Sequence, residues 1–159
     1  SSQRINFSKR YILKMINVII IPARAGSKRL KNKNIFKIKN KTLVERTLEI
    51  SKKIKNVDKI IVSSNDPKIL AYSKKFKNIY FIKRPMNLST SRSLLIDTIN
   101  HLNKLFDKKF SNILVLQPTS PYRSLKFINN NWLKFIKKRK KFKLNFFLLI
   151  LKKLKKKKK

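Results

Sequence analysis

The chain has 159 residues, the length of about one domain, and its apolar fraction of 42% is too high for a wholly disordered protein. It contains no cysteine, which excludes a disulfide framework, a thiolate metal site and a cysteine nucleophile. Its 43 basic residues face only six acidic ones, which gives a formal net charge of +37.

The positive charge is unevenly spread along the chain. All six acidic residues fall between Glu45 and Asp107, whereas the segment from Ser124 to Lys159 carries basic charges only. A charge of this size predicts either contacts with nucleic acid or a solvated basic surface. We favour the solvated surface, because the dominant residue types are those with codons rich in A and T. No RNA-binding signature or zinc-finger spacing is present, and a basic nucleic-acid-binding protein stays open as an alternative.

Residues 1–14 show no clear period and are interpreted as an N-terminal extension ahead of Met15. The apolar run that follows Met15 is short and is ended by Pro22, which argues against a secretory signal. No stretch approaches the roughly 20 apolar residues that span a bilayer. We therefore expect a cytoplasmic protein without a membrane partner.

From Met15 onward, short aliphatic runs alternate with helical patterns. The aliphatic runs at residues 18–21, 59–63, 80–82 and 113–116 predict strands. Thr42 and Glu45 have the spacing of a capping box before a helix to about residue 54, and Asp66 before Pro67 predicts a helix to about residue 76. A third helix is predicted over about residues 93–106. This alternation predicts a parallel sheet, which binds ligands beyond the carboxyl ends of its strands.

The segment after the first predicted strand combines the only glycine of the chain with a group of cations. Residues 20–35 read IIPARAGSKRLKNKNI. Arg24 and Lys33 are among the cations that can face one anion, Gly26 permits a positive φ, and Ser27 offers a hydroxyl group and an amide. The second glycine and the GK[ST] ending of a Walker A loop are absent. By itself the segment indicates either a phosphate cradle or a solvated basic loop.

This string resembles the first motif of the cytidylyltransferases that act on sialic acid and related nonulosonic acids, approximately IIPARxGSKxxxxKN. Three later segments match that family in the same order: IVSSND at residues 61–66, RPxxL at residues 84–88 and LQPTSPYR at residues 116–123. The resemblance covers about residues 15–123. It implies a Rossmann-like nucleotidyltransferase fold with three α/β/α layers and a mainly parallel sheet, here truncated.

The resemblance also implies a reaction, the transfer of CMP from CTP to a nonulosonic acid with release of pyrophosphate, assisted by Mg²⁺. The site residues that it implies are the triphosphate-binding, catalytic Arg24 and Lys33, the nucleotide-binding Ala23, Gly26, Ser27 and Asn34, and the sugar-binding Gln117. The related 3-deoxy-octulosonate cytidylyltransferases, with a first motif closer to IPARxxSxRLPGKPL, stay open as an alternative.

After Arg123 the sequence departs from the family, which continues with a paired-aspartate metal site, much of the sugar pocket and a dimerisation element. No acidic residue follows Asp107, so we expect no family-type metal site and little transferase activity in this chain. We expect a homodimer only where a dimerisation element is supplied. We interpret residues 15–124 as an incomplete nucleotide-binding domain and residues 125–159 as a Lys-rich, low-complexity tail. A frameshift or a truncated reading frame would explain this tail, whose lysines leave little room for a buried face.

Overall fold

The computed structural model describes residues 15–26, 33–107, 110–120, 124–142 and 147–150. Within this part of the chain, five parallel strands form one sheet in the order β5-β4-β1-β6-β7. These strands are β1 (Ile16–Pro22), β4 (Lys59–Ser64), β5 (Tyr80–Lys83), β6 (Phe110–Val115) and β7 (Phe147–Ile150). The parallel sheet expected from the alternating pattern is thus confirmed, with β1 at its centre.

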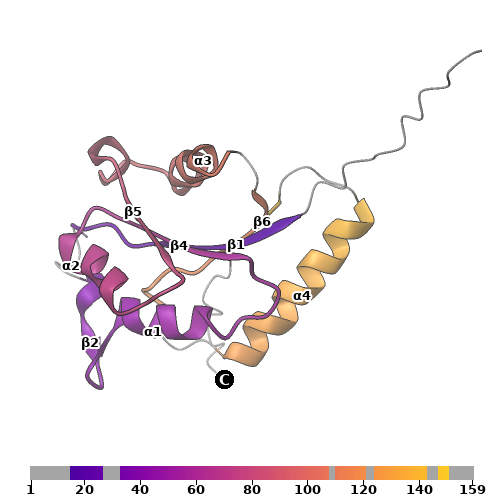
Figure 1. The fold of residues 1–159 in the computed structure, drawn as a ribbon, viewed down its shortest axis with the longest axis horizontal. Coiled ribbons are helices and arrows are strands. Elements are labelled where there is room, and N and C mark those ends of the chain that lie inside the picture. The colour runs from indigo at the N-terminus through magenta and orange to yellow at the C-terminus, as the bar shows by residue number, and fades with distance from the viewer. Residues whose placement is uncertain (1–14, 27–32, 108–109, 121–123, 143–146, 151–159) are drawn as a thin grey trace, which may run out of the picture.

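Helices cover both faces of this sheet, which gives three layers (Figure 1). They are α1 (Leu43–Ser51), α2 (Pro67–Leu70), α3 (Leu95–Leu105) and α4 (Leu125–Phe142). Successive side chains of β1 point to opposite faces of the sheet: Ile19 packs in the cluster with α1, α2 and α4, whereas Ile20 packs in the cluster with α3. Both side chains are fully buried, as expected for a strand covered on both sides. None of the described helices is both long and apolar enough to cross a membrane.

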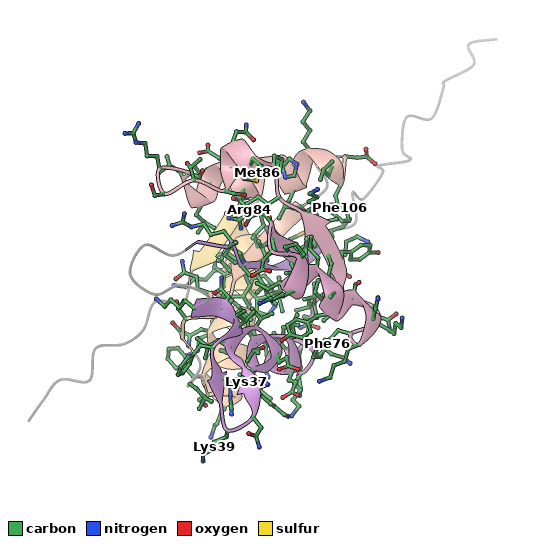
Figure 2. The ribbon with its side chains drawn as sticks, turned by 90° about the vertical axis from the view of Figure 1, so that its left-hand side faces the viewer. Lys37, Lys39, Phe76, Arg84, Met86 and Phe106 are labelled. Carbon is green, nitrogen blue, oxygen red and sulfur yellow. The ribbon has the colours of Figure 1, made fainter. Side chains whose placement is uncertain are left out.

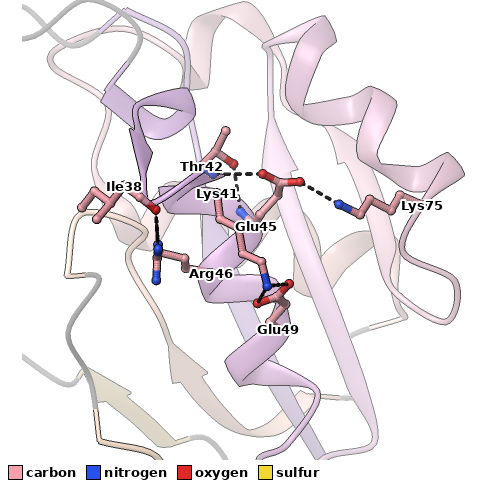
Figure 3. A network of polar contacts seen from close by, with 7 residues as sticks. All are labelled: Ile38, Lys41, Thr42, Glu45, Arg46, Glu49 and Lys75. Carbon is pink, nitrogen blue, oxygen red and sulfur yellow. Dashed lines mark hydrogen bonds and ion pairs between the residues drawn. The ribbon is translucent and has the colours of Figure 1, made fainter.

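The start of α1 is held by the capping box that the sequence predicts (Figure 3). The Thr42 hydroxyl group accepts from the Glu45 N–H at 3.1 Å, and the Glu45 carboxylate accepts from the Thr42 N–H at 2.9 Å. Lys75 donates to the same carboxylate at 2.9 Å. Burial by itself raises the pKa of Glu45, but the hydrogen bonds from Thr42 and Lys75 outweigh it and lower the pKa below its ordinary value.

A small antiparallel hairpin, β2 (Lys37–Ile38) and β3 (Lys41–Thr42), precedes α1. Its turn residues Lys39 and Asn40 both have positive φ, which is typical of a tight two-residue hairpin turn. The guanidinium group of Arg46 in α1 donates to the Ile38 carbonyl group and ties the hairpin to the helix. Lys37 and Lys39 lie at the end of the molecule away from Arg84 (Figure 2).

The segment after Ser124 differs from the sequence interpretation, because α4 has a well-buried face. Ile128, Trp132 and Ile136 recur every four residues and are at most 7% exposed. The Trp132 ring stacks on Phe135 at 5.6 Å, and its indole N–H donates to the Asn56 carbonyl group at 3.4 Å. The expectation that the lysines leave little room for a buried face is therefore wrong for α4: three apolar residues at helical spacing suffice to bury one side of the helix.

Candidate functional site

A cleft of about 300 Å³ opens at the carboxyl ends of β1, β5 and β6. This is the edge at which a parallel sheet binds its ligands. The residues that line the cleft are Pro22, Arg24, Lys33, Asn34, Arg84, Ser93, Leu94, Leu95, Thr98, Gln117, Pro118 and Thr119. Among these described residues three are cationic and none is acidic, so the cleft suits an anion.

Four residues expected at the site from the sequence, Arg24, Lys33, Asn34 and Gln117, line this one cleft. Gly26 is exposed beside it, with φ at +78°, and a Cβ atom at this position would meet no atom within 4 Å. The conformation, rather than lack of space, is thus what favours glycine at this position. Ala23, which was also expected at the site, is fully buried and does not line the cleft. Ser27 and Arg123 lie outside the described residues.

Side chains at the end of β4 hold the backbone of the loop that follows β1. The Ala23 N–H donates to the Ser63 carbonyl group at 2.9 Å, and the Ser64 hydroxyl group donates to the Ala23 carbonyl group at 2.6 Å. Two residues after Ala23, the Ala25 N–H donates to Oδ1 of Asn65 at 2.7 Å. Ala23 thus has both backbone polar groups bonded within the protein, and its role in the described structure is to support the loop.

Arg24 projects from this loop and connects two further parts of the cleft. Its carbonyl group accepts from Nδ2 of Asn34 at 2.9 Å, and its guanidinium group donates to the Thr90 carbonyl group at 2.8 Å. Thr90 belongs to the β5–α3 connection, which is closed on itself by a 2.9 Å hydrogen bond between the hydroxyl groups of Thr90 and Ser93. The loops after β1 and β5 therefore meet at the Arg24 side chain.

Arg84, which follows β5, is a cationic residue of the cleft that the sequence reasoning did not assign to the site. It is only 4% exposed, and its guanidinium group donates to both Oγ and the carbonyl oxygen of Ser63, at 3.0 and 3.1 Å. Burial, together with the positive charge of Arg24, lowers the pKa of Arg84 to about 10. No acidic side chain of the described residues pairs with it. The signal in the sequence was its position in the RPxxL segment at the carboxyl end of a strand.

The described residues do not fit a metal centre built from protein ligands. Within the described ranges, no group of three His, Cys, Asp or Glu residues comes close enough to hold a metal ion. Mg²⁺ binds through oxygen ligands, mainly carboxylates and phosphates, and the described lining of the cleft offers no carboxylate. We therefore assign no described residue to the Mg²⁺ that the family resemblance implies.

Comparison with known proteins places most of this chain in one family. The profile of the family described as cytidylyltransferase matches residues 18–138, which include the cleft and most of α4. The N-acylneuraminate cytidylyltransferase of Escherichia coli O18:K1:H7 is 32% identical over 106 residues, covering 67% of this chain and 25% of that protein. The CMP-N,N'-diacetyllegionaminic acid synthase of Legionella pneumophila is 35% identical over 107 residues, covering 65% and 46%.

The same fold is present in a solved structure of CMP:2-keto-3-deoxy-manno-octonic acid synthetase complexed with CTP. The TM-score is 0.60 with 22% sequence identity, over 77% of this chain and 48% of that one. The chain thus spans less than half the length of these three proteins. The match over residues 18–138, together with the parallel sheet and its cationic cleft, shows that this chain belongs to the cytidylyltransferase family.

Proposed function

We propose that the chain binds CTP in this cleft and serves as the nucleotide-binding part of an enzyme that transfers CMP to a nonulosonic acid. The observation that carries the proposal is the convergence of Arg24, Lys33 and Arg84 on one cleft whose described lining has no acidic residue. Three cations that face one cleft favour an anion there, and a nucleoside triphosphate supplies several negative charges at one place. The names of the relatives support the nonulosonic acid as the acceptor.

In the proposed reaction, the anomeric hydroxyl group of the sugar acid attacks the α-phosphorus of CTP. A new oxygen–phosphorus bond forms, the bond from the α-phosphorus to the bridging oxygen breaks, and pyrophosphate leaves as the hydroxyl proton is lost. Arg24 and Lys33 stabilise the negative charge that develops on the leaving pyrophosphate. Asn34 and Gly26 shape the loop around the nucleotide, and Gln117, exposed on the β6 side of the cleft, binds the sugar.

Titration calorimetry with CTP tests the proposal. Arg24→Ala and Lys33→Ala should each weaken CTP binding by about 1.5–3 kcal/mol, the scale of a lost charged hydrogen bond. Lys37→Ala is the matched control, because Lys37 is an exposed lysine on the hairpin away from Arg84. Unchanged affinity in both cleft variants would remove the triphosphate assignment, and a wild-type chain that binds no CTP would contradict the proposed function itself.

A further inference from the structure

One peptide unit in the loop after β1 is held by asparagine side chains at both of its polar groups. This is the peptide between Arg24 and Ala25. Its carbonyl oxygen accepts from Nδ2 of Asn34 at 2.9 Å, and its N–H donates to Oδ1 of Asn65 at 2.7 Å. The two asparagines come from different elements, the short helix at Lys33–Ile35 and the turn after β4. Because a peptide unit is planar and stiff, hydrogen bonds at both groups fix its orientation.

We propose that Asn65 is a positioning residue for Arg24, which acts by clamping this peptide unit together with Asn34. The proposal rests on the proposed function, in which Arg24 holds the triphosphate. Beyond this peptide the loop continues into Gly26, whose positive φ shows that the chain turns sharply at this point. Glycine offers little steric resistance to rotation of the preceding backbone. Without Asn65, the Ala25 N–H therefore loses its acceptor and the peptide gains freedom to rotate.

Ser64 holds the peptide on the N-terminal side of Arg24, so release of the peptide on its C-terminal side changes the backbone ψ angle of Arg24 and, with it, the direction that the Arg24 side chain prefers. Arg24 is only half-buried, and its guanidinium group is held by one described hydrogen bond, to the Thr90 carbonyl group. A long cationic side chain with this little packing takes its direction from its own backbone. Asn65 therefore controls where the Arg24 charge lies in the cleft, although its own side chain is not among the residues that line the cleft.

Asn65→Ala tests this inference, with Asn129→Ala as a matched control. Oδ1 of Asn129 also accepts from a backbone N–H, that of Lys55 at 2.9 Å, but it is not among the residues that line the cleft. In titration calorimetry, Asn65→Ala should weaken CTP binding by about tenfold, the scale of one lost hydrogen bond, whereas Asn129→Ala should change it less than about twofold. Equal CTP affinity in wild type and Asn65→Ala would overturn the inference.

A double-mutant cycle separates positioning of Arg24 from a general loss of structure. In an Arg24→Ala background, Asn65→Ala should change CTP affinity less than about twofold, because the side chain through which it acts is gone. The same roughly tenfold loss in both backgrounds would show that Asn65 does not act through Arg24, and the inference would fail.

Amide hydrogen exchange, measured without ligand, makes the test independent of the proposed function. Exchange at the Ala25 N–H should accelerate at least about tenfold in Asn65→Ala and stay unchanged in Asn129→Ala, which should instead affect the Lys55 N–H. Unchanged exchange at Ala25 would overturn the clamp whatever CTP does. If the wild-type chain binds no CTP, the proposed function fails, and exchange at Ala25 alone decides whether the clamp exists.

Discussion

Arg84 is a cation that the folded chain buries without an acidic partner among the described residues. Burial of a charge costs free energy that hydrogen bonds to Ser63 offset only in part, since both acceptors are neutral. The lowered pKa of Arg84 reflects this cost together with the repulsion from the charge of Arg24. Such a residue is expected where an anionic or strongly hydrogen-bonding ligand completes the environment of the charge.

Arg84→Met removes this charge while keeping a long apolar side chain. We expect the variant to match or exceed wild type in thermal stability without ligand, because the desolvation cost disappears with the charge. CTP affinity should fall at least about tenfold, since a buried charged partner is lost. Differential scanning calorimetry and CTP titration measure the two effects. Arg46→Met, which removes a guanidinium group bonded to the hairpin, is the control and should leave CTP affinity unchanged.

Ionisation of Arg84 should make the free energy of unfolding depend on pH. At neutral pH the guanidinium group is charged in the folded and unfolded chains, so the full burial cost is present. As the pH rises through about 10, the folded chain loses this proton while the unfolded chain keeps it up to the ordinary value of 12.5, so stability increases with pH in that window. Relative to Arg84→Met, wild type should gain about 1 kcal/mol between about pH 9 and about pH 11 in urea unfolding. A constant difference between the two proteins would contradict this.

At the scale of elements, the stability of α1 depends more on the carboxylate of Glu45 than on that of Glu49. Glu45 serves both the capping box and the ion pair with Lys75, and its side chain is 12% exposed, whereas Glu49 pairs with Lys41 at a solvent-exposed position. Exposed ion pairs contribute little. Glu45→Ala should therefore lower the free energy of unfolding by about 1 kcal/mol more than Glu49→Ala. Urea unfolding measures this near pH 7.

Acid should remove the difference between these two variants. Because the pKa of Glu45 lies below its ordinary value of 4.5, its contribution is present above that value and is lost as the pH falls through the lower, folded-state pKa. A difference that persists at about pH 2 would show that the side chain acts by packing rather than as a carboxylate.

α4 belongs to the folded core on the evidence of its buried face, and Trp132 is the side chain that tests this. Trp132→Ala removes a fully buried indole ring from the cluster that joins α4 to the sheet and should lower the free energy of unfolding by about 3–5 kcal/mol. Phe127→Ala, at a 41% exposed position of the same helix, should cost less than about 1 kcal/mol. Similar small effects in both variants would mean that α4 contributes little to the fold.

The sequence predicted those features that depend on neighbours along the chain. The aliphatic run of β1, the capping box at Thr42 and the cap at Asp66 are local patterns, and all three are present in the structure. The early start of β6 was missed because Asn112 is polar, yet it is fully buried and donates to Oδ1 of Asn17 in β1 at 2.7 Å. The hydrogen bond from the Ala25 N–H to Asn65 could not be predicted either, because the two residues lie 40 positions apart and the pairing of β1 with β4 brings them together.

At the scale of the whole molecule, the few acidic residues act mainly as local hydrogen-bond acceptors. Asp58, Asp66 and Asp97 accept from backbone N–H groups, at 2.7, 2.9 and 3.3 Å, in addition to the ion pairs of Glu45 and Glu49. With 43 basic residues in the chain, most positive charges repel one another without compensation. Added salt screens this repulsion, so the melting temperature should rise with ionic strength up to about 0.15 M.

The same charge separates the proposed function from a nucleic-acid-binding role. Contacts between lysines and phosphates on duplex DNA release counterions and weaken steeply with salt, whereas binding of one small anion by a few directed cations is less sensitive. At about 150 mM salt, we expect the chain to retain CTP and to release random duplex DNA, as measured by calorimetry and fluorescence anisotropy on the same preparation. Retention of the duplex together with loss of CTP would favour the nucleic-acid role.

The placement of α4 has a consequence for the handedness of the fold. α1 and α4 cover the same face of the sheet (Figure 1). The strands that follow these two helices along the chain, β4 and β7, lie on opposite sides of β1 in the sheet order. The β6-α4-β7 connection therefore has the opposite hand to the β1-α1-β4 connection. The β5-α3-β6 connection runs across the sheet in the reverse direction and on the other face, so it has the same hand as β1-α1-β4. Parallel crossovers are right-handed in about 98% of cases, so the connection through α4 is the rare one. The chain reaches β7, at the sheet edge beyond β6, by way of α4, and the Trp132 indole ring is the largest fully buried side chain of that helix.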